Sequence, residues 1–416
     1  MANEAPEVIE VTVEKLVYGG DGLARLDGRV VLAPYVLPGE MVRLESQSSK
    51  PGLVRARPKS ILGPSEHRTT PRCAHFTRCG GCDYQHSSYE YQLDQKVEIL
   101  REVLARVGKI NTGAAGATKI DFTGEVAVIA GPEWNYRNRV QLHFFDGKVG
   151  FHAAGSHKVE DIRECPISSP KINEAIFAFR AMISDRRWPD FLRSLELFTN
   201  ETDVQVNVIE SGGKRLAKPF FNWVAENVAG ADATALEYDT VTGPFRVSHK
   251  SFFQTNRFLV DALSKEVLTG RAGKSAWDLY AGVGLFSLPL AAAFETVTAV
   301  ESSAAASGDL KFNAERAGRT VDVHHSGVEQ FLAAQEQAPE FVLADPPRAG
   351  LGKAVVGHLA RLKPQRITLV SCDPATLARD LAELLGHGYT IERLTLADLF
   401  PQTAHLETVV HLQAGS

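Results

Sequence analysis

The sequence predicts an α/β protein built from three consecutive parts. After Lys250, short apolar strands alternate with helical segments, which is typical of a parallel sheet covered by helices. Residues 7–58 contain short strands separated by glycine-rich turns, which favours a small β-barrel. The region between them mixes strands and helices, so we expect a central α+β domain. We place the three domains at residues 1–62, 63–250 and 251–416.

The first element is the barrel, with strands expected over residues 8–16, 23–26, 29–33 and 41–45. Barrels of this size often bind oligonucleotides, although a purely structural barrel is an alternative.

A long helix is expected next. Ser87 and Glu90 have the spacing of a capping box, and Gly108 is expected to end the helix. Apolar residues recur every three or four positions, which predicts one face packed on a core. These residues are Tyr89, Leu93, Val97, Leu100, Leu104 and Val107. The segment 111–118 is rich in Gly, Ala and Thr and is interpreted as a loop.

A glycine turn follows the first strand of the C-terminal part. The strand expected near residues 276–280 leads into Asp278-Leu279-Tyr280-Ala281-Gly282-Val283-Gly284, and a helix is expected over 285–294. Glycines here let the backbone approach a ligand, and Glu301, at the end of the next strand, can hold ribose hydroxyls. Only two of the three glycines of a dinucleotide fingerprint are present, so NAD(P) is not favoured. S-adenosylmethionine fits better, and a simple tight turn is the alternative.

Two further strands, expected at residues 341–344 and 367–370, end in polar motifs. Asp345-Pro346-Pro347-Arg348 follows the first strand and Ser371-Cys372-Asp373-Pro374 follows the second. Because ligands bind such sheets at the carboxyl ends of their strands, both motifs are expected beside the glycine turn.

Cys372 is therefore a candidate nucleophile, with a core cysteine as the alternative. No histidine or basic residue adjoins it in the sequence, so its activation must come from the fold or the substrate. His405 and Glu407 precede a last strand over 408–412, where a solvated acid is the alternative to a functional one.

Length and composition exclude several classes of protein. Of the 416 residues, 44% are hydrophobic and 23% are charged, which excludes a disordered or fibrous chain. No apolar run approaches the roughly 18 residues of a membrane-spanning helix. The N-terminus lacks the features of a signal peptide, so we expect a cytoplasmic protein with no membrane partner. The net charge of -5 does not indicate nucleic-acid binding, but residues 50–82 hold seven basic side chains against one acid.

The motifs above, together with Ser251-Phe252-Phe253-Gln254-Thr255-Asn256, follow the order found in the RNA uracil-5-methyltransferase family, which this chain closely resembles. The resemblance covers nearly the whole sequence. It implies that the barrel is a TRAM module of OB-like form, that the central domain binds RNA, and that the C-terminal domain is a Rossmann-like class I methyltransferase domain.

The resemblance also implies a reaction and its residues. Uracil C5 is a poor nucleophile, so a thiolate must first add to C6, and Cys372 matches that family cysteine. Glu407 matches the base that then removes the C5 proton. S-adenosylmethionine is the implied methyl donor. Its contacts are assigned to Gln254, Tyr280, Gly282, Gly284, Glu301 and Asp345.

The other cysteines match an iron–sulfur motif. Cys73, Cys79, Cys82 and the distant Cys165 are the implied ligands of a [4Fe-4S] cluster. Four thiolates also suit zinc, which stays the less favoured alternative because the spacing is not that of a zinc ribbon. The cluster would tie the basic stretch to the central domain.

Three positions depart from the family pattern: Ala281 replaces a frequent Cys, Leu285 an Asn that contacts the cofactor, and Asp373 a frequent Asn. The Asn contact is therefore not carried over to Leu285.

An enzyme that acts on C5 and C6 of a base in folded RNA must flip that base out of its stack. Candidate aromatic and basic contacts are Phe252, Phe253, Tyr136, Arg137 and Arg139. The barrel favours 23S rRNA over the T-loop uridine of tRNA as the substrate, and we expect a monomer.

Two rivals are a non-catalytic RNA-binding protein with a vestigial methyltransferase domain and an N-methyltransferase acting on an exocyclic amine. The presence of both Cys372 and Glu407 argues against the first, and Arg348 with Cys372 argues against the second.

Overall fold

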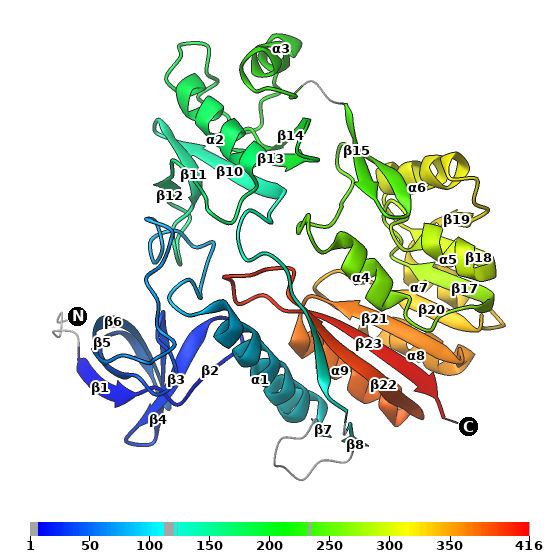
Figure 1. The fold of residues 1–416 in the computed structure, drawn as a ribbon, viewed down its shortest axis with the longest axis horizontal. Coiled ribbons are helices and arrows are strands. Elements are labelled where there is room, and N and C mark those ends of the chain that lie inside the picture. Colours follow the sequence, from blue (N-terminus) through cyan, green and yellow to red (C-terminus); the bar gives the residue numbers. More distant parts are fainter. Residues whose placement is uncertain (1–6, 112–119, 123, 232–233, 416) are drawn as a thin grey trace.

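The computed structural model describes residues 7–111, 120–122, 124–231 and 234–415 (Figure 1). The loop expected over residues 111–118 lies almost entirely outside these ranges. At the N-terminus, six strands form one curled sheet of order β1-β5-β6-β4-β3-β2 around a small apolar core. Their bounds are β1 Val8–Thr12, β2 Lys15–Leu16, β3 Asp21–Leu26, β4 Arg29–Pro34, β5 Met41–Lys50 and β6 Leu53–Gly63. The strand β6, which carries much of the basic stretch, was not among the expected strands.

Helix α1 (Tyr89–Gly108) begins one residue later than a cap at Ser87 would require. Its N-cap is Ser88, with no side-chain capping hydrogen bond, so the predicted Ser87 capping box is wrong. Val107, expected on the packed face, is 43% exposed, whereas Lys96 is fully buried. The reason is that α1 packs against helix α9 (Pro374–Gly386), so the C-terminal domain decides which face is covered.

The central region holds a five-stranded antiparallel sheet of order β12-β11-β10-β13-β14. Its strands are β10 Arg139–Phe145, β11 Lys148–His152, β12 Val159–Asp161, β13 Ser194–Thr199 and β14 Val204–Glu210. Helices α2 (Pro170–Met182) and α3 (Lys218–Asn227) share one apolar cluster with this sheet. The region therefore has a core of its own.

The C-terminal domain is a mixed sheet of order β19-β18-β17-β20-β21-β23-β22-β9. Its strands are β17 Gly273–Leu279, β18 Phe294–Glu301, β19 Asp322–His325, β20 Phe341–Ala344, β21 Arg366–Ser371, β22 Tyr389–Ala397 and β23 Glu407–Ala414. The helices between them are α5 Ser287–Ala293, α6 Ala304–Arg316, α7 Val328–Ala333, α8 Gly352–Leu362 and α9. Helix α4 (Val260–Val267) precedes β17.

Several elements from before residue 250 join this domain. Strand β9 (Val126–Ile129) pairs in parallel with β22, and α1 packs on α9. The hairpin β15 (Ala235–Thr240) and β16 (Gly243–Ser248) lies against α6. The short strands β7 (Ile110–Asn111) and β8 (Ile120–Asp121) pair with each other after α1. The core of the C-terminal domain thus draws on residues that lie far apart in the sequence.

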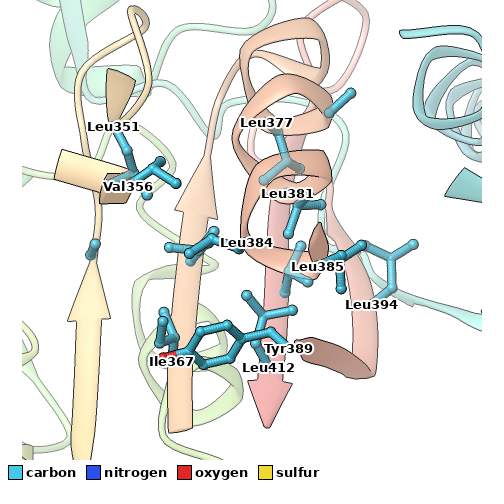
Figure 2. Close-up of a cluster of buried hydrophobic side chains, with 14 of the residues drawn as sticks. Leu351, Val356, Ile367, Leu377, Leu381, Leu384, Leu385, Tyr389, Leu394 and Leu412 are labelled. Atoms are coloured by element: carbon cyan, nitrogen blue, oxygen red, sulfur yellow. The ribbon is translucent and has the colours of Figure 1, made fainter. Parts of the chain in front are cut away.

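Leucines of α9 hold that helix on the sheet. Figure 2 shows Leu377, Leu381 and Leu384 of α9 beside Ile367 of β21 and Leu412 of β23. Each fully buried leucine contributes about 1.5–3 kcal/mol. This packing fixes the loop between β21 and α9, where Cys372 lies. No helix in the described ranges is long and apolar enough to cross a membrane.

Candidate active site

The sheet topology brings the sequence motifs to one edge. Strands β18, β17, β20 and β21 are parallel, so their carboxyl ends lie together. Strand β23 is antiparallel to β21, with Ser371 opposite Thr408. Cys372, which follows β21, and Glu407, which begins β23, are therefore neighbours at this edge. The chain order reverses between β17 and β20, the point where ligands bind in open α/β sheets.

The glycine turn after β17 has left-handed backbone at Tyr280, Gly282 and Gly284, with φ angles of 65°, 56° and 93°. A Cβ atom on Gly282 would meet no atom within 4 Å, so this part of the turn faces open space. A Cβ atom on Gly284 would lie 3.0 Å from the Leu288 side chain and 3.1 Å from that of Leu310. Gly282 thus leaves room for a ligand, whereas Gly284 allows close helix packing.

Glu301 ends β18 beside this turn. Its two carboxylate oxygens accept the backbone N–H groups of Gly282 at 2.9 Å and Ser303 at 2.6 Å. The nearby Asp278 is fully buried, and burial raises its pKa to about 7. Its Oδ1 atom has no hydrogen-bond partner within the described ranges. An unpaired buried oxygen in the strand that leads into the glycine turn is compatible with a polar ligand such as S-adenosylmethionine.

Two of the other residues assigned to the cofactor, Tyr280 and Asp345, lie at the same edge. Tyr280 is half-buried, and burial raises its pKa to about 12. Asp345 follows β20, and its backbone N–H donates to the Leu279 carbonyl at 3.3 Å. Gln254 is half-buried in the segment before α4. Sequence reasoning thus selected Tyr280, Glu301 and Asp345, which the fold gathers around β17, β18 and β20.

Asp345 and Glu407 form a pair of carboxyl groups held in a protein environment that disfavours charge. Burial raises the pKa of Asp345 to about 7. The pKa of Glu407 lies well above its usual range, first because of burial and second because of the Asp345 charge. Arg348 acts in the opposite direction on Glu407. Both groups therefore stay neutral to a higher pH than an ordinary carboxyl group.

Cys372 lies within the field of these groups. Burial, and then the Glu407 charge, raise the pKa of its thiol to about 11, and Arg348 offsets part of this increase. Arg348 also lies 3.4 Å from Nδ1 of His405. Burial lowers the pKa of His405 to about 4, so this imidazole is neutral at pH 7. The free protein therefore holds the thiol of Cys372 protonated.

Two residues near Cys372 were not selected as site residues. Arg348 was noted only as part of its motif, yet it affects the pKa values of both Cys372 and Glu407. Tyr18 of the N-terminal sheet hydrogen-bonds Asp373 at 2.9 Å. Nothing in the sequence connects Tyr18 with a motif 355 residues away.

The four remaining cysteines line one cavity of about 230 Å³. They are Cys73, Cys79, Cys82 and Cys165. Burial is the first cause that raises the pKa of Cys79, to about 11, and those of Cys73 and Cys82. Within the described part of the chain, no group of three or more His, Cys, Asp or Glu side chains is arranged to hold a metal ion. Four thiols that line one cavity are nevertheless the donor set of an iron–sulfur cluster, whose ligands lie farther apart than those of a single ion.

Three of the five candidate RNA contacts are buried. Tyr136 is 0% exposed and donates to the Pro401 carbonyl, and Phe253 is 2% exposed in the core. Arg139 is 9% exposed and pairs with Glu196 at 2.9 Å. These three expectations are wrong, because the residues join the central sheet to the C-terminal domain. Phe252, at 59%, is exposed, and Arg137 is half-buried beside the cysteine cavity.

Part of the basic stretch is neutralised by ion pairs. Arg55 pairs with Asp21, Lys59 with Glu45, Arg68 with Glu40 and Arg78 with Glu160. For the other members, Lys50, Arg57 and Arg72, no ion pair is found among the residues described. Arg72 instead stacks over the Trp134 ring at 5.3 Å.

Comparisons with known proteins agree with this geometry. The family model "tRNA (Uracil-5-)-methyltransferase" matches residues 183–415, and a TRAM domain model matches residues 6–59. An uncharacterized RNA methyltransferase of Aquifex aeolicus is 32% identical, covering 97% of this chain and 98% of the relative. A 23S rRNA (uracil(1939)-C(5))-methyltransferase of Halomonas elongata is 31% identical, covering 97% and 89%.

A solved structure gives the same result for the fold. The tRNA (uracil-54, C5)-methyltransferase of Pyrococcus abyssi, in complex with S-adenosyl-L-homocysteine, superposes with a TM-score of 0.76 at 26% identity. The match covers 97% of this chain and 99% of that structure. The fold class predicted from the sequence is confirmed, and so is the resemblance: this chain belongs to the RNA uracil-5-methyltransferase family.

Proposed function

We propose that this protein transfers a methyl group from S-adenosylmethionine to C5 of a uridine in 23S rRNA. The observation that carries the proposal is the meeting of Cys372 and Glu407 at the end of the sheet that also holds the glycine turn. Full-length similarity to a 23S rRNA methyltransferase supports the choice of RNA.

Cys372 begins the reaction. Its thiolate sulfur bonds to C6, the electrons of the C5–C6 double bond move toward O4, and C5 becomes nucleophilic. S-adenosylmethionine supplies the methyl group as an electrophile. Glu407 then takes the C5 proton, the double bond re-forms, and the bond from C6 to sulfur breaks. A carboxyl group whose pKa lies above its usual range is a stronger base, once ionised, than an ordinary carboxylate.

The residues around the glycine turn bind the cofactor in this proposal. Glu301 would receive the ribose hydroxyls, and Gly282 would let the ligand approach the backbone. Tyr280, Gln254 and Asp345 would enclose the rest, while Gly284 keeps the turn close to α6. Competition between S-adenosylmethionine and S-adenosylhomocysteine in a calorimetric titration tests this assignment.

Trapping with 5-fluorouridine RNA tests the nucleophile. A base can remove a proton from C5 but cannot remove fluorine, so the bond between C6 and sulfur does not break. The protein should form a covalent, cofactor-dependent adduct at Cys372. Cys372→Ser keeps the size of the side chain and should form none. An adduct in that variant would sink the assignment.

Glu407→Gln tests the base. It should accumulate the adduct on ordinary RNA, since the C5 proton stays in place. Glu315→Gln on the exposed face of α6 is the matched control. Loss of RNA binding without any adduct would count against Glu407 as the base.

The T-loop uridine of tRNA is the second candidate substrate, favoured by the likeness to the Pyrococcus abyssi enzyme. Mapping 5-methyluridine in ribosomal and transfer RNA from a strain that lacks the protein decides between the two. Loss of one 23S position supports the proposal, and loss of the T-loop modification alone replaces it. A full set of modifications in that strain would favour the non-catalytic RNA-binding alternative.

We also propose that Cys73, Cys79, Cys82 and Cys165 hold a [4Fe-4S] cluster of structural role, with zinc as the alternative. Their shared cavity supports this proposal. Anaerobic purification followed by iron, sulfide and zinc analysis tests it, and zinc without sulfide would overturn it.

For the domain plan, we propose that residues 1–62 form the RNA-binding TRAM barrel and residues 251–416 the methyltransferase domain. Residues 63–250 then supply both the central sheet and elements of the C-terminal core. The match of a TRAM model to residues 6–59 supports the first boundary.

A further inference from the structure

One hydrogen bond joins the N-terminal barrel to the loop that carries Cys372. The hydroxyl of Tyr18, between β2 and β3, donates to Oδ2 of Asp373 at 2.9 Å. Asp373 directly follows Cys372 in the chain. Tyr18 is half-buried and packs against the large apolar cluster that includes α9. Its position is therefore set by the core as well as by this hydrogen bond.

The second oxygen of the same carboxylate caps helix α9. Oδ1 of Asp373 accepts the backbone N–H groups of Ala375 at 3.0 Å and Thr376 at 2.9 Å. Asp373 is thus held from two sides, by the first turn of α9 and by Tyr18. Because the peptide plane between residues 372 and 373 is rigid, fixing Asp373 restricts the backbone of Cys372.

The barrel is also linked, through Asp83, to the segment that leads to Glu407. Gly20, two residues after Tyr18, lies so close to Asp83 that a Cβ atom on it would stand 3.1 Å from the Asp83 side chain. Oδ2 of Asp83 accepts the backbone N–H of Ala404 at 2.8 Å. A salt bridge of 2.8 Å between Lys15 and Glu102 anchors the same part of the barrel to α1. The turn between β2 and β3 therefore contacts the Cys372 loop directly and the segment before Glu407 through Asp83.

We propose that Tyr18 is a positioning residue for the nucleophile: through Asp373 it fixes the loop that carries Cys372, so the barrel is a structural part of the active site. This inference rests on the proposed role of Cys372. It assigns the barrel a task beyond RNA binding. Removing the Tyr18 hydroxyl would leave Oδ2 of Asp373 without its donor and leave more negative charge on the residue that follows Cys372, which disfavours the thiolate.

The test compares Tyr18→Phe with Tyr389→Phe. The control hydroxyl donates to the Pro364 carbonyl at the same distance, 2.9 Å, away from the site. In Tyr18→Phe, kcat on RNA should fall about tenfold, which corresponds to about 1.4 kcal/mol. Iodoacetamide alkylation of Cys372 at pH 8 should slow about threefold, because the unpaired Asp373 charge opposes ionisation of the neighbouring thiol. RNA affinity should stay within about twofold, and Tyr389→Phe should change neither rate.

Asp373→Asn gives a second measurement, because an amide keeps an oxygen for the hydroxyl or for the helix cap. Asp373→Asn should reduce kcat less than Tyr18→Phe does. The fold reduction of kcat in the double variant should be smaller than the product of the two single reductions. An unchanged kcat and alkylation rate in Tyr18→Phe would overturn the inference. Weaker RNA binding with an unchanged kcat would overturn it too, because the barrel would then only bind RNA.

The proposed function and the positioning role of Tyr18 can be refuted separately. If the unmodified protein forms no 5-methyluridine on any RNA, the proposed function is wrong. Alkylation of Cys372 requires no methyl transfer, so the comparison of Tyr18→Phe with Tyr389→Phe still decides the positioning role.

Discussion

Arg348 is the cation that favours the thiolate of Cys372, and its removal should make the thiol less reactive. The pKa of Cys372 is about 11, so about one thiol in a thousand is ionised at pH 8. Arg348 is exposed, and an exposed charge pair contributes about 0.5–1 kcal/mol. Arg348→Gln should therefore lower the thiolate fraction about two- to fivefold. The control is Arg319→Gln. Arg319 is exposed and lies just before β19, the outermost strand on the other side of the sheet from β21.

The assay is iodoacetamide alkylation of the free protein between pH 7 and 10.5, with the Cys372 peptide quantified by mass spectrometry. Because only the thiolate reacts, the rate should rise about tenfold per pH unit up to about pH 10. The alkylation rate of Arg348→Gln should be lower than that of the unmodified protein at every pH in this range. The rate of Arg319→Gln should match the unmodified protein. A plateau below pH 9 in the unmodified protein, or faster alkylation of Arg348→Gln, would refute this account of the site.

Three further predictions concern stability and cofactor binding. Asp345→Asn should stabilise the fold at pH 8 by up to about 4 kcal/mol. The pKa of Asp345 is raised to about 7 in the folded protein, so ionisation of this carboxyl group opposes folding. The cost grows from about pH 4 to pH 7 and is constant above pH 7. Urea titrations at pH 4.5 and pH 8 check this, and an equal effect at both values would contradict it. Lys96→Met should cost about 3–5 kcal/mol, because it leaves Asp398, which is 1% exposed, without its partner at 2.6 Å. Adding Asp398→Leu should recover most of the loss, and the exposed Lys274→Met should cost little in the same denaturation assay. Gly284→Ala should lower the melting temperature more than Gly282→Ala, since only Gly284 lacks room for a Cβ atom. Gly282→Ala should instead weaken S-adenosylmethionine binding in calorimetry, and the reverse pattern would contradict the assignment of the turn.

The C-terminal sheet could be predicted from the sequence because each strand leaves a local signal. The apolar run 341–344 matches β20, and the run 367–370 lies within β21. Each is followed by a polar motif, and the alternation with helices predicts that these motifs share one edge. The placement of Asp345 and Cys372 at one edge followed from this reasoning alone.

Long-range packing could not be predicted in the same way. Strand β9 pairs with β22, which lies more than 260 residues later, and the short apolar run 126–129 does not reveal its partner. The buried Lys96 shows the same limit, since only Asp398 explains a lysine on the packed face of α1. Tyr136 looked like an RNA contact because it is aromatic and flanked by arginine, yet the Pro401 carbonyl accepts its hydroxyl inside the protein.

The residue types alone do not predict the protonation states of the site. Burial disfavours ionisation of Cys372, Asp345 and Glu407, with pKa values of about 11 for Cys372 and about 7 for Asp345. Arg348 offsets only part of this effect. Chemistry that needs a thiolate and a carboxylate therefore requires positive charge that these residues do not supply. A sulfonium cation among these groups would favour both ionised forms by Coulomb attraction, whereas the neutral thioether of S-adenosylhomocysteine would not.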